Sequence, residues 1–130
     1  MLNFLFVAIG GSIGASLRYS SYIFFKNYLF SNYIFLNTLF VNIVGSFLIG
    51  YAIMLMESKN LSVDFIKYFL IIGVLGSFTT FSTFSIESVD LLLSKKFFQA
   101  FSYMFLSLSL CLLFTFIGLN FNKIINWSKK

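Results

Sequence analysis

The sequence has no proline, no histidine and one cysteine, and only 10% of its 130 residues are charged. Without histidine, neither a histidine metal site nor histidine acid–base catalysis is available. The single Cys111 excludes a disulfide within the chain. No nucleophile–base pair stands out, so we expect no enzyme. Without proline, any broken helix must be broken at glycine, serine or threonine.

Apolar residues dominate what is present. They make up 59% of the chain, and the mean hydropathy is +0.94. A soluble domain of this size keeps much of its surface exposed and cannot bury that many apolar side chains. The sequence therefore predicts an integral membrane protein. The net charge of +5 suits contact with anionic lipid headgroups. The lysines are scattered, so we expect no nucleic-acid partner.

Four apolar segments predict an all-α fold with four transmembrane helices, because a span needs about 20 apolar residues. They cover approximately residues 4–25, 35–56, 65–93 and 98–121. The polar joints between them are short, which favours an up-down bundle in a single domain over residues 1–130. We expect a multi-pass protein of the cell membrane.

The charges of the joints give a weak orientation signal. Four spans place both termini on one side, with Lys59, Lys67, Lys123, Lys129 and Lys130. The other side has Lys26, Lys95 and Lys96, together with Arg18 if its side chain reaches the interface. The positive-inside rule needs a clear bias to fix orientation. Five charges against four predict that the chain inserts in both orientations.

The third segment contains the unusual stretch GSFTTFSTF, from Gly76 to Phe84. A straight helix over residues 65–93 rises about 1.5 Å per residue and would overshoot a hydrocarbon core of about 30 Å. We therefore expect the helix to break near its middle, at Gly76 to Thr80. The broken backbone must then be buried in protein or line a wet cavity, because lipid cannot satisfy its polar groups.

Two earlier motifs have both packing and functional interpretations. In GGSIGASLRY (Gly10 to Tyr19), small residues four apart favour close helix packing. Arg18 either reaches the interface or supplies positive potential for an anion. In the second segment, Asn42 either makes an interhelical hydrogen bond or directs its amide N–H into a pore, because a buried amide needs a partner.

A polar stripe follows the fourth segment. Tyr103, Ser107, Cys111 and Thr115 recur every four residues, so they share one helical face. Each hydroxyl could simply bond back to its own helix, but four in register favour a lined pathway. In the third segment, the positive ring edges of Phe81 and Phe84 could contact a small anion. Ser82 and Thr83 add donors there, at the start of a second half-helix.

The motifs GGSIGASLRY, NIVGSF and Gly73 to Ser85, GVLGSFTTFSTFS, occur in this order on four short spans and resemble the Fluc/CrcB fluoride channels. The resemblance covers nearly the whole chain. It implies an antiparallel, dual-topology homodimer with narrow pores that carry fluoride out of the cell and relieve its toxicity. It also implies a structural Na⁺ at the dimer centre, held by the backbone carbonyls of Gly76 and Thr79.

The resemblance assigns roles to side chains as well. It places on the fluoride pathway Asn42, Phe81, Ser82, Phe84, Tyr103, Ser107 and Thr115. It places Arg18 and Glu87 at the aqueous vestibule or pore end. Cys111 stands at a position of the pathway where some relatives have serine, and a thiol is the weaker donor.

Two other functions remain as alternatives. A small exporter of cationic compounds would also be an antiparallel four-span dimer, but it needs a deep carboxylate to bind its cargo and protons. The first, second and fourth spans have none, and Glu87 and Asp90 fall near the end of the third. A membrane scaffold without transport would tolerate apolar replacements of its polar residues.

Overall fold

The computed structural model describes residues 1–29, 35–57 and 62–127, with the side chains of residues 126 and 127 left aside. Within these ranges every regular element is a helix. In chain order the elements are α1 (Leu2–Phe24), η1 (Phe25–Leu29), α2 (Phe35–Glu57), η2 (Phe65–Leu75), α3 (Gly76–Phe78), α4 (Phe81–Leu93), α5 (Phe97–Leu119) and α6 (Phe121–Trp127). The predicted all-α fold is confirmed for the described part of the chain.

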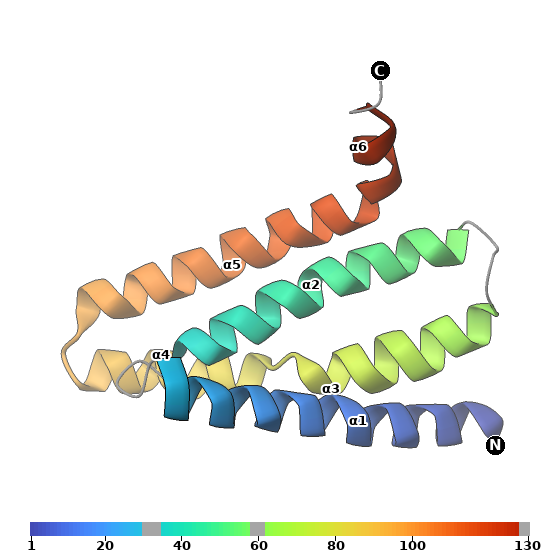
Figure 1. Cartoon of the computed structure of the whole chain (residues 1–130). Coiled ribbons are helices and arrows are strands. Elements are labelled where there is room, and N and C mark those ends of the chain that lie inside the picture. Colours follow the sequence, from blue (N-terminus) through green and yellow to red (C-terminus); the bar gives the residue numbers. More distant parts are fainter. Residues whose placement is uncertain (30–34, 58–61, 128–130) are drawn as a thin grey trace.

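The helices form two packed pairs that lie side by side (Figure 1). α2 runs along α5, and α1 runs along η2 and α3. Successive spans alternate in direction, so α6 and the start of α1 lie at the same end of the bundle. α4 continues the line of α3 beyond a break and packs on α5. The break therefore lies near the middle of the bundle, where the two pairs meet.

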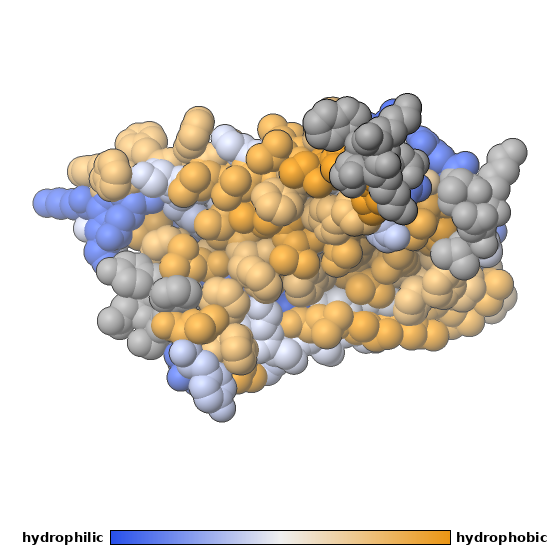
Figure 2. All heavy atoms as spheres, turned by 45° about the horizontal axis from the view of Figure 1, so that its top comes forward, coloured by the Kyte–Doolittle hydropathy of each residue, from blue (hydrophilic) through white to orange (hydrophobic). Residues whose placement is uncertain are grey.

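Four stretches among the described residues are long and apolar enough to cross a membrane. Their bounds are Leu2–Leu29, Phe35–Glu57, Phe65–Leu93 and Phe97–Leu119, close to the four predicted spans. Apolar side chains cover most of the face seen in Figure 2, and hydrophilic ones gather at its two ends. That distribution is what a hydrocarbon layer between two aqueous phases requires.

The fourth span is shorter than predicted. It ends at Leu119 instead of Phe121, because the chain turns at Asn120 and starts the short helix α6. The Asn120 side chain donates to the Phe116 carbonyl at 3.0 Å. Phe121 then packs edge-on against the rings of Phe47 and Tyr51, with centroids 5.6 and 5.4 Å away. These contacts fix the start of α6 against α2.

The third span is interrupted at Thr79 and Thr80, as predicted. Both residues are extended, with φ/ψ of −79°/157° and −152°/117°. Its first half, η2, is wound as a π-helix over 11 residues, which the sequence did not predict. A π-helix closes its hydrogen bonds over five residues instead of four, so it is wider and shorter per residue. The winding and the break together accommodate 29 residues in one span.

Glycines allow the helix pairs to approach closely. A methyl group added at Gly10 or Gly14 would overlap the carbonyl oxygen of Phe69 or Val74, respectively. The α2–α5 contact has the same form, since a methyl group on Gly118 would overlap the Phe47 carbonyl oxygen. The packing role expected for the small residues of the first segment is confirmed.

The joint between α4 and α5 is a tight helix end. Lys95 has φ 58°, and the N–H groups of Lys95 and Lys96 donate to the carbonyls of Leu92 and Leu91, each at 3.0 Å. This is the Schellman arrangement, in which glycine usually takes the left-handed position. Three lysines counted in the charge comparison lie outside the described residues: Lys59, Lys129 and Lys130.

Candidate functional site

The amide of Asn42 holds the broken segment of the third span. Its Nδ2 donates to the Thr80 carbonyl at 3.0 Å, and its Oδ1 accepts from the Thr80 N–H at 2.8 Å. Thr80 is buried, with 6% of its surface exposed, so water cannot serve these groups instead. Of the two roles considered for Asn42, the interhelical hydrogen bond is therefore confirmed. One hydrogen of Nδ2 remains beyond this pair.

The break redirects two backbone donors away from their usual helical acceptors. In an unbroken helix each N–H bonds the carbonyl four residues earlier, so those of Thr80 and Thr83 would reach Gly76 and Thr79. Here the Thr80 N–H donates to Asn42, and the Thr83 N–H donates to Thr80 Oγ1 at 3.1 Å. The carbonyls of Gly76 and Thr79 thus lose the donors that a continuous helix would give them.

Thr80 also starts the second half-helix. Its Oγ1 accepts from the Thr83 N–H, which makes it the N-cap of α4. The same oxygen lies 3.0 Å from the Thr83 hydroxyl and 3.2 Å from the Ser82 hydroxyl. The N-terminal end of α4, where the helix dipole is positive, is therefore fixed by Thr80 and through it by Asn42.

A first cavity of about 310 Å³ lies on one side of Thr80. We call it the arginine cavity, and its polar lining includes Arg18, Asn37, Thr38, Thr80, Thr83 and Glu87. Arg18 is half-buried, and its residue forms part of this lining. Asn37 is almost fully buried, and its Oδ1 accepts from the Ser21 hydroxyl at 2.6 Å.

Glu87 joins three helices beside the arginine cavity. Its Oε1 accepts from Thr38 Oγ1 of α2 at 2.9 Å, and its Oε2 accepts from Tyr103 Oη of α5 at 2.7 Å. Thr38 and Tyr103 are both buried, with 2% of their surface exposed. The carboxylate is thus bound inside the bundle and is more than an acidic group near a helix end. A cation exporter needs a carboxylate inside the bundle, and Glu87 is one, so carboxylate depth alone does not exclude an exporter.

A second cavity of about 230 Å³ lies on the other side of Thr80. We call it the phenylalanine cavity; besides Thr79 and Thr80, its lining includes Asn42, Ser46, Phe81, Phe84, Ser107 and Cys111. Ser107 is 5% exposed, and its Oγ is buried without a hydrogen-bond partner among the described residues. A buried hydroxyl without a partner costs about 1–3 kcal/mol, so Ser107 is a donor beside this cavity that lacks its usual bond.

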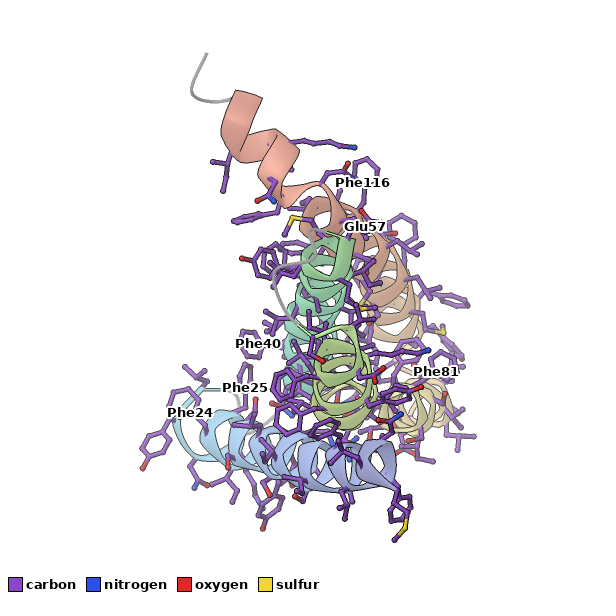
Figure 3. All side chains as sticks on the ribbon, turned by 90° about the vertical axis from the view of Figure 1, so that its right-hand side faces the viewer. Phe24, Phe25, Phe40, Glu57, Phe81 and Phe116 are labelled. Atoms are coloured by element: carbon purple, nitrogen blue, oxygen red, sulfur yellow. The ribbon has the colours of Figure 1, made fainter. Side chains whose placement is uncertain are left out.

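Three aromatic rings follow one another beside this cavity. The centroids of Phe81 and Phe84 are 5.4 Å apart, and those of Phe84 and Tyr103 are 5.2 Å apart. Phe84 is buried, whereas 73% of Phe81 is exposed. Figure 3 shows Phe81 at the outer side of the helices. In the single chain, the phenylalanine cavity therefore reaches the surface of the bundle at Phe81.

The structure separates the members of the predicted α5 stripe. Ser107 and Cys111 line the phenylalanine cavity, and Tyr103 bonds to Glu87. Thr115 instead donates back to the Cys111 carbonyl at 2.9 Å and lines neither cavity. Ser82 is exposed and also lies outside both linings. The stripe is therefore continuous in sequence but not in its contacts.

Sequence reasoning missed Thr38, Ser46 and Thr80, although a signal for the first two was present. Thr38, Asn42 and Ser46 recur every four residues and so share one face of α2. Asn42 and Ser46 line the phenylalanine cavity together with Ser107 and Cys111 of the α5 stripe, whereas Thr38 lines the arginine cavity. Thr80 had no separate signal, because its importance comes from Asn42, 38 residues earlier in the chain.

The clusters needed for a metal centre of acidic, cysteine or histidine side chains are absent among the described residues. Backbone oxygens can also bind a cation, and the carbonyls of Gly76 and Thr79 are two of those that the break separates from their helical donors. Hard cations such as Na⁺ favour such oxygens.

Comparisons with known proteins agree on one family. Residues 5–119 match the family model described as CrcB-like protein, Camphor Resistance (CrcB). A relative from Flavobacterium psychrophilum, named fluoride-specific ion channel FluC, is 37% identical over 92% of this chain and 95% of its own length. Proteins of the same name from Campylobacter hominis and Shewanella woodyi are 39% and 44% identical. Those matches cover 94% and 91% of this chain and 96% and 94% of theirs.

Proposed function

This chain belongs to the CrcB-like family, and from that premise we propose that it is a fluoride-selective ion channel of the cell membrane. The relatives are named as ion channels for fluoride, not as enzymes or exporters. Neither the exporter nor the scaffold alternative is favoured. We propose no catalytic residue.

The phenylalanine cavity carries the proposal. It combines hydrogen-bond donors with the rings of Phe81 and Phe84, and its Ser107 hydroxyl is buried without a partner among the described residues. Fluoride is a small anion that accepts hydrogen bonds strongly. Donors and positive ring edges stabilise an anion without offering a cation an attractive partner. A narrow bore with this lining favours fluoride over the larger chloride.

The pathway that we propose passes from the arginine cavity to the phenylalanine cavity. Arg18 gives the first cavity a positive charge that attracts anions. Glu87 is bound by Thr38 and Tyr103 at the edge of this cavity, which supports a role at the pore end. Thr80 lines both cavities, and Asn42, which is bonded to it, lines the second, so the proposed route passes these two residues.

Ser82 and Thr115 were expected on the same pathway, and we propose both as members of it. Ser82 is exposed at the first turn of α4, and Thr115 bonds back to its own helix. Rotation of the Thr115 hydroxyl would free its donor for a passing ion. Replacing each with alanine and measuring fluoride flux decides whether it contributes.

We propose that two copies assemble as an antiparallel homodimer. A single bundle leaves Phe81 largely exposed at the mouth of the phenylalanine cavity, so a second copy would complete the wall. The weak charge bias between the two sides permits the opposite orientations. An N-terminal protease-cleavable tag tests this. In sealed vesicles about half of the tags should be cut, and all of them after permeabilisation; cleavage of all or none in sealed vesicles would contradict it.

A structural Na⁺ at the dimer centre is the last part of the proposal. The released carbonyls of Gly76 and Thr79 fit such an ion, and each copy would supply its own pair. Bound, the ion would stabilise the break and supply no chemistry to transport. The proposal predicts that the purified dimer unfolds at a higher temperature in sodium chloride than in N-methylglucamine chloride of equal ionic strength. Equal unfolding temperatures would contradict it.

Such a channel gives a microbe a passive exit for fluoride. Hydrogen fluoride enters as a neutral weak acid from acidic surroundings and dissociates inside, where the anion is trapped. The fluoride gradient and the membrane potential then drive the anion out. The direct test is efflux from liposomes that hold purified protein and potassium fluoride, with valinomycin to balance charge and a fluoride electrode outside. Fluoride release without chloride release from a matched load is expected; no release from folded protein would overturn the function.

A further inference from the structure

Cys111 is the one nucleophilic thiol of the chain, and it faces the phenylalanine cavity. It is half-buried and free, and it lies one turn after Ser107 on α5. Side chains four residues apart lie on the same helical face, so the thiol and the Ser107 hydroxyl line the same hollow. The position of Cys111 alone shows only that a thiol lines the cavity.

The Ser107 hydroxyl provides the second, independent observation. Only 5% of the Ser107 surface is exposed, and within the part of the chain that the structure describes its Oγ has no hydrogen-bond partner. Buried polar atoms of native proteins are nearly always paired, so an unpaired one beside a cavity indicates that a polar guest enters there. That guest is water or the conducted ion. The space next to Cys111 is therefore suited to a small polar guest.

The volume of the cavity sets which molecules can enter. A space of about 230 Å³ exceeds the roughly 30 Å³ that one water molecule takes in the liquid. A group of two heavy atoms on Sγ therefore fits, and it would displace the guest next to Ser107. The same group would lie against the Phe81 and Phe84 rings, which line the same cavity.

We propose that Cys111 is a site of reversible thiol modification at which small, uncharged thiosulfonates and disulfides close the phenylalanine cavity. The inference rests on the proposed function, because closing matters only if this cavity conducts. In the reaction the Cys111 thiolate attacks the sulfenyl sulfur of the reagent. A new sulfur–sulfur bond forms and the reagent's own sulfur–sulfur bond breaks. The leaving group, a sulfinate from a thiosulfonate or a thiolate from a disulfide, takes the electron pair. The thiol proton goes to solvent, and a dithiol reverses the modification by exchange.

The test uses methyl methanethiosulfonate on the purified full-length protein in fluoride-loaded liposomes. Mass spectrometry measures the methylthio adduct, and a fluoride electrode measures efflux from the same sample. We expect one adduct per chain, a loss of efflux of at least roughly tenfold, equivalent to about 1.4 kcal/mol, and recovery after dithiothreitol. A complete adduct with unchanged efflux would overturn the proposal. So would a thiol that reacts only after denaturation.

Two variants separate the cavity from a general effect of the reagent. Cys111→Ser has no thiol, so its own efflux rate, whatever its value, should be the same with and without reagent. Cys111→Ser combined with Leu113→Cys moves the thiol to a side chain that is 50% exposed and outside the cavity lining. Its adduct should leave efflux unchanged; block equal to that of the wild type would overturn the proposal. No efflux from untreated wild-type protein would instead overturn the proposed function, while the adduct measurement would still decide whether Cys111 is reachable.

Discussion

Replacing Asn42 with aspartate tests both the clamp on Thr80 and the ion path beside it. The change keeps the shape of the side chain and its acceptor for the Thr80 N–H, 2.8 Å away. It replaces the donor that faces the Thr80 carbonyl at 3.0 Å with a second oxygen. The substitution therefore removes one hydrogen bond and brings a negative charge to the phenylalanine cavity.

The two effects have different sizes. Leaving one buried backbone group without its partner costs about 1–3 kcal/mol of stability. Two unit charges about 4 Å apart interact by about 4 kcal/mol at an effective dielectric constant of about 20. Because about 1.4 kcal/mol corresponds to a factor of ten, an ionised aspartate should reduce fluoride flux by roughly a thousandfold. The electrostatic effect should therefore dominate the loss of flux.

The matched control is Asn42→Ala, which removes both hydrogen bonds without adding charge. Fluoride efflux and the thermal unfolding midpoint in detergent should be measured for both variants. We expect alanine to destabilise the protein at least as much as aspartate and to conduct better. Full flux in Asn42→Asp would refute the placement of Asn42 beside the ion path. Equal losses of flux in the two variants would assign the effect to the clamp instead of the charge.

Three further changes have expected outcomes. Phe81→Ile removes a ring edge worth about 0.5–1.5 kcal/mol, so fluoride efflux should fall by up to roughly tenfold while dimers still assemble; unchanged efflux would argue against ring-edge contact. In Gly118→Ala the new methyl group would overlap the Phe47 carbonyl, so the protein should lose about 1–3 kcal/mol of stability and its unfolding midpoint should fall. The control is Gly11→Ala, whose methyl group would lie 3.3 Å from the movable Ser77 hydroxyl and should cost less stability. Lys95→Gly relieves a left-handed backbone with φ 58° and should stabilise by about 1 kcal/mol; a lower midpoint would contradict this.

Much of the fold follows from patterns that act locally. Runs of apolar residues set the four spans, because their length must match the bilayer. The break at Thr79 and Thr80 was predictable for two reasons: the segment is too long for a straight helix, and its middle is rich in glycine and hydroxyl side chains. Helix α6 was missed because its apolar start, Phe121, continues the fourth run.

Other features depend on contacts between distant parts of the chain. The π-helical winding of η2 has no signal in its sequence, FIKYFLIIGVL, which is apolar throughout except for one lysine and one tyrosine. Whether Asn42 bonds another helix or faces a pore depends on how closely α2 approaches the break. Gly45 determines that approach, since a methyl group there would overlap the Thr79 side chain.

The candidate site was predicted best where residues repeat on one helical face. Ser107 and Cys111 of the α5 stripe line one cavity, because a period of four keeps side chains in register. The period could not show that Thr115 would bond its own helix, since a hydroxyl chooses between donor directions by a rotation about one bond. The exposure of Ser82 depends on how α4 is rotated after the break, and Thr80 sets that rotation through its capping bond.

The central claim is that this chain conducts fluoride selectively, and its most direct test is the zero-current potential of purified protein in a planar bilayer. The two chambers hold equal chloride and a tenfold gradient of fluoride, with an impermeant cation. Selective fluoride conduction predicts a zero-current potential displaced by about 59 mV in the direction set by the fluoride gradient. A zero-current potential that stays at zero, in a bilayer that does carry current when a voltage is applied, would contradict the account.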